Sequence, residues 1–285
     1  MGTMEGSPTP PATDSAGQSP ASSTHRYRIV VEYDGTDFAG WQRQEGQRTI
    51  QQTLEDAIKQ MVGETVFVRG ASRTDAGVHA DGQVATVALE TKIPPHGLLR
   101  GLNSILPADV ALVDVAALPD QADVDPAELV PGTAPSVRPF DARFSARGKV
   151  YRYTVWNHFV RSPRRARTAW HVREPLDLDA IRRAAAELVG EHDFRAFRAS
   201  DCDRRTTRRV VRQLTVDRQG PVVTFEIEAT AFLKNMVRIV VGTLIDVGRG
   251  RLPPDAVARM LESGERAAGG MTAPAHGLTL LRVIY

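Results

Sequence analysis

Apolar and polar residues alternate along the chain in a pattern of strands and amphipathic helices that occurs twice. In the first half, the run YRIVVEY (Tyr27–Tyr33) is rich in β-branched and aromatic residues and predicts a strand. Thr49 and Gln52 form a capping-box pattern, and the apolar spacing from Ile50 to Met61, ended by Gly63, predicts a helix. Two strands (Thr65–Arg69 and Gln83–Leu89), a short helix (Leu98–Ile105) and a strand (Val110–Val115) are predicted next.

The second half repeats this order. It predicts strands at Val150–Trp156, Arg209–Val216, Val222–Ala229 and Leu278–Ile284, and helices at Leu178–Leu188, Leu233–Val247 and Pro254–Leu261. Each half therefore reads β-α-β-β-α-β, a unit that forms a largely antiparallel sheet with helices on one face. We expect an α+β fold in which two pseudo-symmetric halves form one mixed sheet with a cleft between them.

Two further segments lack such patterning. Residues 1–24 are rich in Pro, Ser, Thr and Gly, and we expect a disordered tail there. Residues 119–137 combine acids with prolines, as in a surface insertion. The expected division is thus a tail (1–24), an N-terminal half (25–118), an insertion (119–137) and a C-terminal half (138–285).

Composition excludes several classes of protein. The chain of 285 residues is 42% hydrophobic and 25% charged, as is usual for a globular protein. The single cysteine, Cys202, excludes a disulfide framework and a cysteine-based zinc site. There is no run of ~18 apolar residues and no secretory pattern at the start, so we expect a soluble, cytoplasmic protein without a membrane partner.

Charge is distributed unevenly. Residues 101–137 hold six acids and no lysine or arginine, whereas residues 141–212 hold 18 basic residues against nine acids. Arginine, which suits phosphates and stacks on bases, accounts for 17 of the 18. A charge run is often only a solvated face, but a segment of this length with interleaved aromatic residues favours a nucleic-acid partner.

The segment RGASRTDAGVHADGQ (69–83) carries the clearest candidate chemistry. Asp75 lies between two predicted strands, with Arg73 before it and His79 after it. A free aspartate titrates near pH ~3.9, so Asp75 would be ionised at neutral pH and could act as nucleophile or base. It could also cap a turn, which is the commoner role of an aspartate before a glycine. His79 is more typical of a structural histidine, although His79, Asp75 and Asp81 together could also belong to a metal-dependent hydrolase.

Aromatic and basic residues elsewhere have two interpretations each. The segment DGTDFAGW (34–41) lacks a phosphate-loop pattern. It is either a shaped loop over a ligand, with Phe38 and Trp41 as contacts, or a tight turn. Tyr151 and Tyr153 alternate along a strand and face one side, where they could stack on bases or join the core. Arg238 is either a surface charge or a cation in the cleft.

Four segments together resemble the tRNA pseudouridine synthase A family. They are YDGTDFAGWQRQ, SRTDAGVHADGQV, FDARFSARGKVYRYTVWN and FLKNMVRIVVGTLIDVGRG, and the resemblance extends from about Arg26 to Tyr285. It implies two βαββαβ halves with a basic central cleft. The implied reaction is the isomerisation of uridine to pseudouridine at positions 38, 39 and 40 of the tRNA anticodon stem-loop, without cofactor or metal. The implied assembly is a homodimer in which one tRNA contacts both subunits.

The resemblance also implies roles for four residues. Asp75 matches the catalytic nucleophile, with attack on the ribose carbon or the uracil ring left open, and Arg73 matches the arginine that fills the space of the flipped nucleotide. Tyr151 matches the tyrosine that stacks on the target base, and Arg238 matches the cation paired with the carboxylate. Ser72, Lys234 and Thr279 depart from the family's usual residues.

Phosphate contacts are expected from the arginine-rich segment, chiefly Arg204, Arg205, Arg208 and Arg209. Because alternate strand residues face opposite ways and some arginines could pair with Asp201 or Asp203, only a few contacts are expected. A non-catalytic RNA-binding protein would use the same basic face and is the alternative hypothesis.

Overall fold

The computed structural model of the protein describes residue 2, residues 24–119 and residues 139–285. The expected tail and insertion therefore lie almost entirely outside the described residues. Those two expectations, and the division of the chain that depends on them, stay predictions.

The N-terminal half holds four strands and two helices. They are β1 (His25–Tyr33), α1 (Ile50–Val62), β2 (Arg69–Gly70), β3 (His79–Leu89), α2 (Pro95–Ile105) and β4 (Val110–Ala117). Helix α1 begins as predicted, because the Thr49 side chain accepts a hydrogen bond from the Gln52 backbone N–H, and it ends at Gly63 with a φ of 81°. The Gln52 side chain bonds Asp56 instead of reaching back to Thr49, so only half of the capping box forms.

One predicted strand is wrong. Of the expected strand Thr65–Arg69 only Arg69 pairs, together with Gly70, against β3. The backbone N–H of Val68 donates to the buried Glu55 carboxylate of α1 at 3.1 Å. The chain before Arg69 therefore follows the helix and does not join the sheet.

The C-terminal half follows the predicted order with two short strands added. Its elements are β5 (Gly148–Asn157), β6 (Trp170–Val172), α3 (Leu178–Ala186), β7 (Gly190–Asp193), β8 (Arg208–Gln219), β9 (Val222–Ala229), α4 (Met236–Gly248), α5 (Ala256–Ser263) and β10 (Leu278–Ile284). Strands β6 and β7 are too short to show a pattern in the sequence. Helix α4 begins three residues later than predicted because Asn235 has a left-handed backbone, with a φ of 61°.

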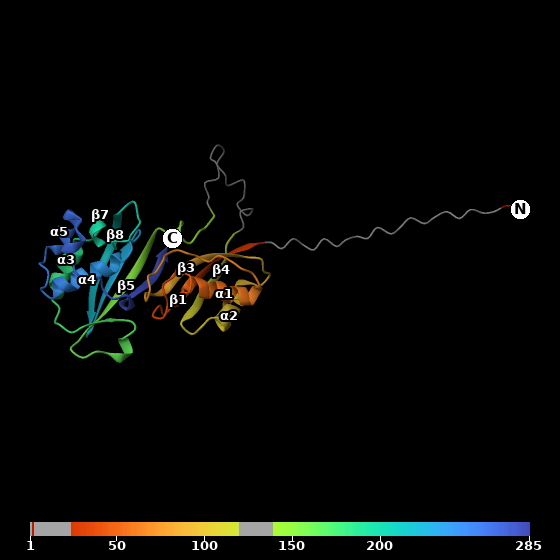
Figure 1. The fold of residues 1–285 in the computed structure, drawn as a ribbon, viewed down its shortest axis with the longest axis horizontal. Coiled ribbons are helices and arrows are strands. Elements are labelled where there is room, and N and C mark those ends of the chain that lie inside the picture. The colour runs from red at the N-terminus through yellow and green to blue at the C-terminus, as the bar shows by residue number, and fades with distance from the viewer. Residues whose placement is uncertain (1, 3–23, 120–138) are drawn as a thin grey trace, which may run out of the picture.

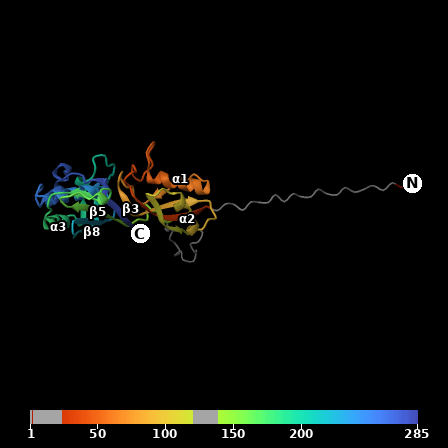
Figure 2. The ribbon, with the colours of Figure 1, turned by 90° about the horizontal axis from the view of Figure 1, so that it is seen from below.

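The last strand joins the two halves into one sheet. The strand order is β4-β1-β3-β10-β5-β9-β8-β7. Strand β10 pairs in parallel with β3 and antiparallel with β5. The C-terminus accordingly lies near the centre of the molecule, with α1 and α2 towards one end and α3, α4 and α5 towards the other (Figures 1 and 2). The predicted α+β fold with a mixed, largely antiparallel sheet is confirmed.

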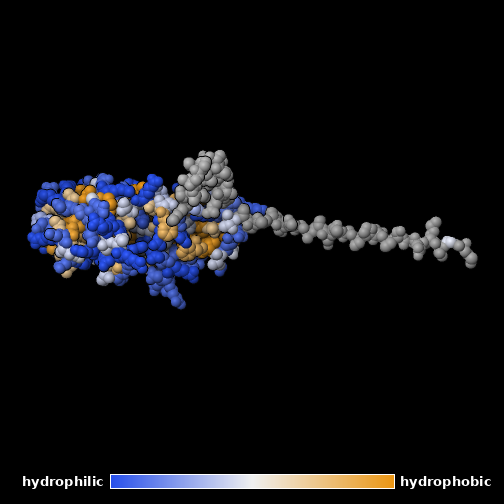
Figure 3. Space-filling model, turned by 90° about the horizontal axis from the view of Figure 1, so that it is seen from above, coloured by the Kyte–Doolittle hydropathy of each residue, from blue (hydrophilic) through white to orange (hydrophobic). Residues whose placement is uncertain are grey.

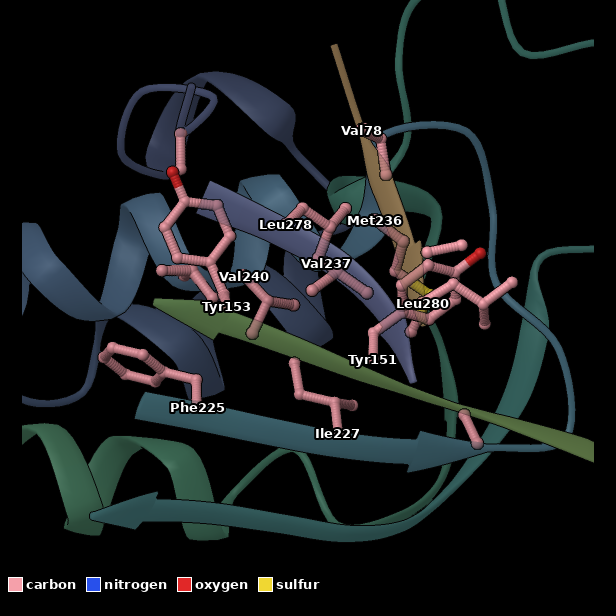
Figure 4. Packing of buried hydrophobic residues seen from close by; sticks show 14 of the residues in the cluster. Val78, Tyr151, Tyr153, Phe225, Ile227, Met236, Val237, Val240, Leu278 and Leu280 are labelled. Atoms are coloured by element: carbon pink, nitrogen blue, oxygen red, sulfur yellow. The ribbon is translucent and has the colours of Figure 1, made fainter. Parts of the chain in front are cut away.

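One face of the sheet is covered by helices. A row of paired residues, Tyr33, Ala80, Leu280, Tyr151 and Ile227, crosses the sheet from β1 to β9 and points to one side. In the C-terminal half this side meets Met236, Val237 and Val240 of the α4 segment (Figure 4). Along β1 and β9 the residues in between are partly buried or exposed, so the helices lie on one face as predicted.

The surface and the helix lengths agree with this arrangement. Hydrophilic residues cover most of the face in Figure 3, with small hydrophobic patches between them. Helices α1 and α4, at 13 residues each, are the longest α-helices among the described residues, and no helix of that part of the chain could cross a membrane.

Candidate active site

An open cleft of about 1190 Å³ lies between residues 67–78 of the N-terminal half and residues 201–209 and 231–238 of the C-terminal half. Strand β5 contributes Lys149 and Tyr151 to its lining. Eight basic side chains line it: Arg69, Arg73, Arg143, Lys149, Arg204, Arg209, Lys234 and Arg238. Only three acids do so, namely Asp75, Asp201 and Asp203. The cleft is therefore basic and suits a polyanion.

The loop that carries Asp75 is fixed through its backbone by residues 34–41. The Trp41 N–H donates to the Thr74 carbonyl at 3.0 Å, and the Gly77 N–H donates to the Phe38 carbonyl at 3.2 Å. Gly40 has a φ of 103°, and a Cβ there would lie 2.6 Å from the Thr74 oxygen. The rings of Phe38 and Trp41 are 3% and 2% exposed. Residues 34–41 therefore form a support for the Asp75 loop, and the two rings belong to the core.

Both nitrogens of His79 have structural partners. Its Nδ1 accepts the Gly35 N–H at 3.1 Å, and its Nε2 donates to the Arg167 carbonyl at 2.8 Å. The ring is buried, as expected of a structural histidine. Asp81 is exposed, and the described residues contain no group of three or more His, Cys, Asp or Glu arranged to hold a metal ion. Nothing in this arrangement favours the metal-dependent hydrolase.

Asp75 and Arg238 face each other across the cleft. The Arg238 Nη1 lies 3.8 Å from the Asp75 Oδ2, and the two side chains are 18% and 32% exposed. Arg238 is held in place by hydrogen bonds to the Ala273 carbonyl at 2.8 Å and to the Asn235 Oδ1 at 2.9 Å. Within the described residues the Asp75 carboxylate accepts no hydrogen bond, so its oxygens are available to a substrate.

The pKa of Asp75 differs from the value expected of a free aspartate. Burial raises the pKa of its carboxyl above the usual value, and the charges of Arg238 and Lys234 oppose this increase, while Asp201 adds to it. Arg238 is thus the main counter-charge. Arg73, by contrast, is exposed and makes no ion pair or hydrogen bond within the described part of the chain.

Tyr151 and Tyr153 share a face, as predicted, but differ in environment. Tyr153 is fully buried and donates to the Pro274 carbonyl at 2.7 Å, so it belongs to the core. Tyr151 is 6% exposed, lines the cleft and lies edge-on to Phe232, with 5.0 Å between ring centres. Its hydroxyl is 3.0 Å from the Ser72 hydroxyl. Burial raises the pKa of Tyr151 to about 12, so the phenol stays protonated at neutral pH.

The four arginines expected to contact phosphates separate into two pairs. Arg204 and Arg209 line the cleft, whereas Arg205 and Arg208 are not part of its lining. Arg208 donates to Glu191 at 3.0 Å, and its neighbour Arg209 points the other way along β8. Asp201, expected as a partner of these arginines, instead pairs with Lys234.

Sequence reasoning missed three cleft residues. Ser72 and Lys234 were noted only as departures from the family pattern, yet one contacts Tyr151 and the other pairs with Asp201. Lys149 was not singled out at all. Its position two residues before Tyr151 was the available signal, because residues i and i+2 of a strand share a face.

Comparisons with known proteins agree with this geometry. The sequence profile of a family described as tRNA pseudouridine synthase matches residues 29–125 and 184–285. A tRNA pseudouridine synthase A from Pelobacter propionicus is 44% identical over 258 residues, covering 90% of this chain and 98% of that protein. A protein of the same name from Myxococcus xanthus is 44% identical over 261 residues, covering 91% and 92%. The chain therefore belongs to the tRNA pseudouridine synthases, a family of isomerases.

Proposed function

We propose that this enzyme isomerises uridine to pseudouridine at positions 38, 39 and 40 of the tRNA anticodon stem-loop, with Asp75 as its nucleophile. Membership of the family supports tRNA as the substrate. The observation that carries the proposal is the position of Asp75. Its carboxylate lies in a basic cleft, 3.8 Å from Arg238, on a loop held rigidly from behind.

The reaction exchanges one bond for another. The bond between uracil N1 and ribose C1′ breaks, the base rotates, and a new bond forms between C5 and C1′. The proton on C5 is lost and N1 gains a proton, so the product is an isomer and no external oxidant or reductant is consumed. A carboxylate nucleophile assists by attacking either the ribose carbon or the uracil ring and departing later. No cofactor is required by this balance.

The target nucleotide must leave its helical stem before Asp75 can reach it, at a cost of a few kcal/mol. We assign Arg73 to the space that the nucleotide vacates, because its guanidinium is exposed and unpaired among the described residues. We assign Tyr151 to stacking on the flipped base, where its buried ring borders the cleft close to Asp75. Phosphate contacts from Arg204 and Arg209, which line the cleft, would hold the stem.

We further propose that the enzyme acts in the cytoplasm as a homodimer in which one tRNA contacts both subunits. The resemblance of the sequence to the family is what supports this assembly. Light scattering of the purified protein, alone and with one equivalent of tRNA, would give the mass of each species. A monomer under both conditions would contradict the dimer and leave the catalytic proposal intact.

A position-mapping experiment tests the proposed reaction. tRNA transcripts with uridine at 38, 39 or 40, one position at a time, are incubated with the enzyme, and pseudouridine is located by chemical derivatisation and primer extension. We expect modification at each of the three positions and none in transcripts with cytidine there. Asp75→Asn serves as the inactive control. Modification elsewhere, or RNA binding without any turnover, would contradict the proposal and favour the non-catalytic alternative.

A further inference from the structure

Lys149 differs from the other lysine of the cleft. The chain contains four lysines, Lys59, Lys92, Lys149 and Lys234, and the last two line the cleft. The Lys234 ammonium donates to the Asp201 carboxylate. Lys149 makes no hydrogen bond and no ion pair within the described part of the chain, although most of its side chain is buried. A buried cation without a partner needs an explanation.

The charged groups around Lys149 are all basic. Its neighbours on the adjacent strands, Ala229 and Val283, carry no charge. Arg143, from the segment before β5, and Arg204, from the segment before β8, both act on its charge. Burial and then these two guanidinium groups lower the pKa of Lys149 to about 8.

Arg209, which also lines the cleft, likewise has a buried polar group without a partner. Its Nη1 donates to the Arg208 carbonyl, but its Nε is buried and has no partner. Burial, together with the charge of Arg204, lowers the pKa of its guanidinium from the usual value. Asp203 also lines the cleft, yet it forms no ion pair within the described residues.

Like charges held close together destabilise the free protein unless an anion completes the site. The missing partner must be anionic and must offer several oxygen acceptors, because an ammonium and at least two guanidinium groups converge on it. A phosphodiester has this chemistry. Lys149 also lies two residues before Tyr151 on the same face of β5, and hence about 7 Å along the strand from it.

We propose that Lys149, together with Arg143 and Arg204, binds an RNA backbone phosphate adjacent to the nucleotide held at Tyr151. The inference rests on the proposed function, because it takes Tyr151 as the binding position of the target base. Lys149 is then a positioning residue that fixes the backbone on one side of the flipped nucleotide. It does not enter the bond-breaking step.

The site should couple RNA binding to the uptake of a proton. Free Lys149 loses its charge as the pH rises through about 8, and a bound phosphate restores the charge by raising the pKa. RNA affinity should therefore fall between pH 7 and 9. Arginine at this position would stay charged throughout this range and should remove the decline.

The test compares Lys149→Met, Lys149→Arg and the control Lys59→Met, which removes an exposed lysine on α1 outside the cleft lining. Binding of an anticodon stem-loop RNA is measured against salt and pH, and single-turnover rates are measured at saturating RNA. We expect Lys149→Met to weaken binding about tenfold at pH 7 and to flatten the salt slope by about 0.7–0.9. The saturated rate should change less than threefold. Lys149→Arg should bind like the wild type at pH 7 and lose the decline towards pH 9.

A second measurement guards against a variant that fails to fold. Lysines of the wild-type protein are ¹³C-methylated, and the signal missing from the Lys149→Arg spectrum identifies Lys149. Its signal should titrate near pH 8 without RNA and at a higher pH with RNA. A titration near pH ~10.4 that RNA does not move, or unaltered binding by Lys149→Met, would overturn the proposal. If either of these contrary results accompanied normal isomerisation, only the phosphate site would be refuted. If binding depended on Lys149 but no isomerisation occurred, the proposed function would be refuted instead.

Discussion

The two walls of the cleft are built in opposite ways. On the N-terminal wall, the Asp75 loop is held by backbone hydrogen bonds from Trp41 and Phe38, and Thr74 meets the Tyr33 hydroxyl at 2.8 Å. On the C-terminal wall, Arg204 and Arg209 line the cleft without an acidic partner among the described residues. The backbone of the Asp75 loop thus has its hydrogen bonds satisfied internally, whereas these two arginines of the opposite wall are open to an external anion.

This difference separates two functions. A nucleophile has to be placed accurately, so rigid internal bonding around Asp75 favours catalysis. A phosphate-binding wall gains from unpaired cations, because groups that already have carboxylate partners would first have to lose them. We infer that the N-terminal wall supplies the nucleophile and that the unpaired arginines of the C-terminal wall hold the RNA, and five predictions test this division of roles.

The largest effect is expected from Asp75→Asn. The amide is nearly isosteric but a poor nucleophile, so turnover should fall by at least about 10³-fold, while RNA affinity should change less than threefold. Because burial raises the pKa of Asp75, the ionised group costs folding free energy at neutral pH. The variant should therefore melt at the same temperature as the wild type or slightly above it. Turnover close to the wild-type rate would remove Asp75 from the mechanism.

Arg238→Gln should reduce the saturated rate by about 10²-fold and alter its pH dependence. Arg238 opposes the burial-driven increase in the pKa of Asp75, so its loss raises that pKa further. The carboxylate must be ionised to react, and the acidic limb of kcat/KM against pH should move to higher pH. Arg238→Lys is the matched control and should keep the limb close to its original place. An unmoved limb in the glutamine variant would separate Arg238 from Asp75.

Tyr151→Ala removes the ring proposed to stack on the target base, an interaction of ~1–3 kcal/mol. It should lower kcat/KM by about 5–150-fold, whereas Tyr151→Phe keeps the ring and should lose much less. Rates are compared in single-turnover experiments, with thermal melting as a check on folding because the ring also packs on Phe232. Equal rates for the alanine variant and the wild type would make Tyr151 a core residue only.

Replacing Arg204 and Arg209 by alanine should weaken RNA binding and flatten its salt dependence by roughly one to two units of slope. The matched control is the pair Arg205→Ala and Arg208→Ala, which lies outside the cleft lining. A salt titration of binding distinguishes the two double variants. If the control pair flattened the slope more than the cleft pair, the RNA path would follow the other side of β8.

The smallest effect is expected from Ser72→Ala, which breaks the contact between Ser72 and the Tyr151 hydroxyl. A hydrogen bond of this kind contributes ~0.5–1.5 kcal/mol, so the rate should fall about 2–10-fold. Combined with Tyr151→Phe, the substitution should cost nothing further, because the hydroxyl is already absent. Additive losses in this double-mutant cycle would show that Ser72 acts independently of Tyr151.

Local signals in the sequence were sufficient for most of the fold. Thr49 and Gly63 delimit α1 because both act through bonds to nearby backbone, and the strand Leu278–Ile284 has the predicted bounds. The strand Thr65–Arg69 was wrong because a distant carboxylate, Glu55, binds the backbone of Val68. Contacts between residues far apart in the sequence are what patterning cannot supply.

The same limit applies to the site. The position of Asp75 on a rigid loop was predictable, since its motif lies between two strand-like runs. The partners of the basic residues were not predictable from the sequence. Arg208 pairs with Glu191 and Lys234 pairs with Asp201, whereas Lys149 has neither an acidic nor a hydrogen-bond partner in the described structure. Which basic side chain is free to bind a ligand therefore depends on the fold, and the number of basic residues in the sequence does not reveal it.

The most direct test of the division between the walls measures binding and saturated single-turnover rate in the same preparation. Asp75→Asn is compared with the double variant Arg204→Ala and Arg209→Ala on one anticodon stem-loop RNA. We expect Asp75→Asn to bind like the wild type and lose its rate. The double variant should bind more weakly and, at saturating RNA, react within about threefold of the wild type. Loss of binding by Asp75→Asn, or loss of the saturated rate by the double variant, would contradict the account.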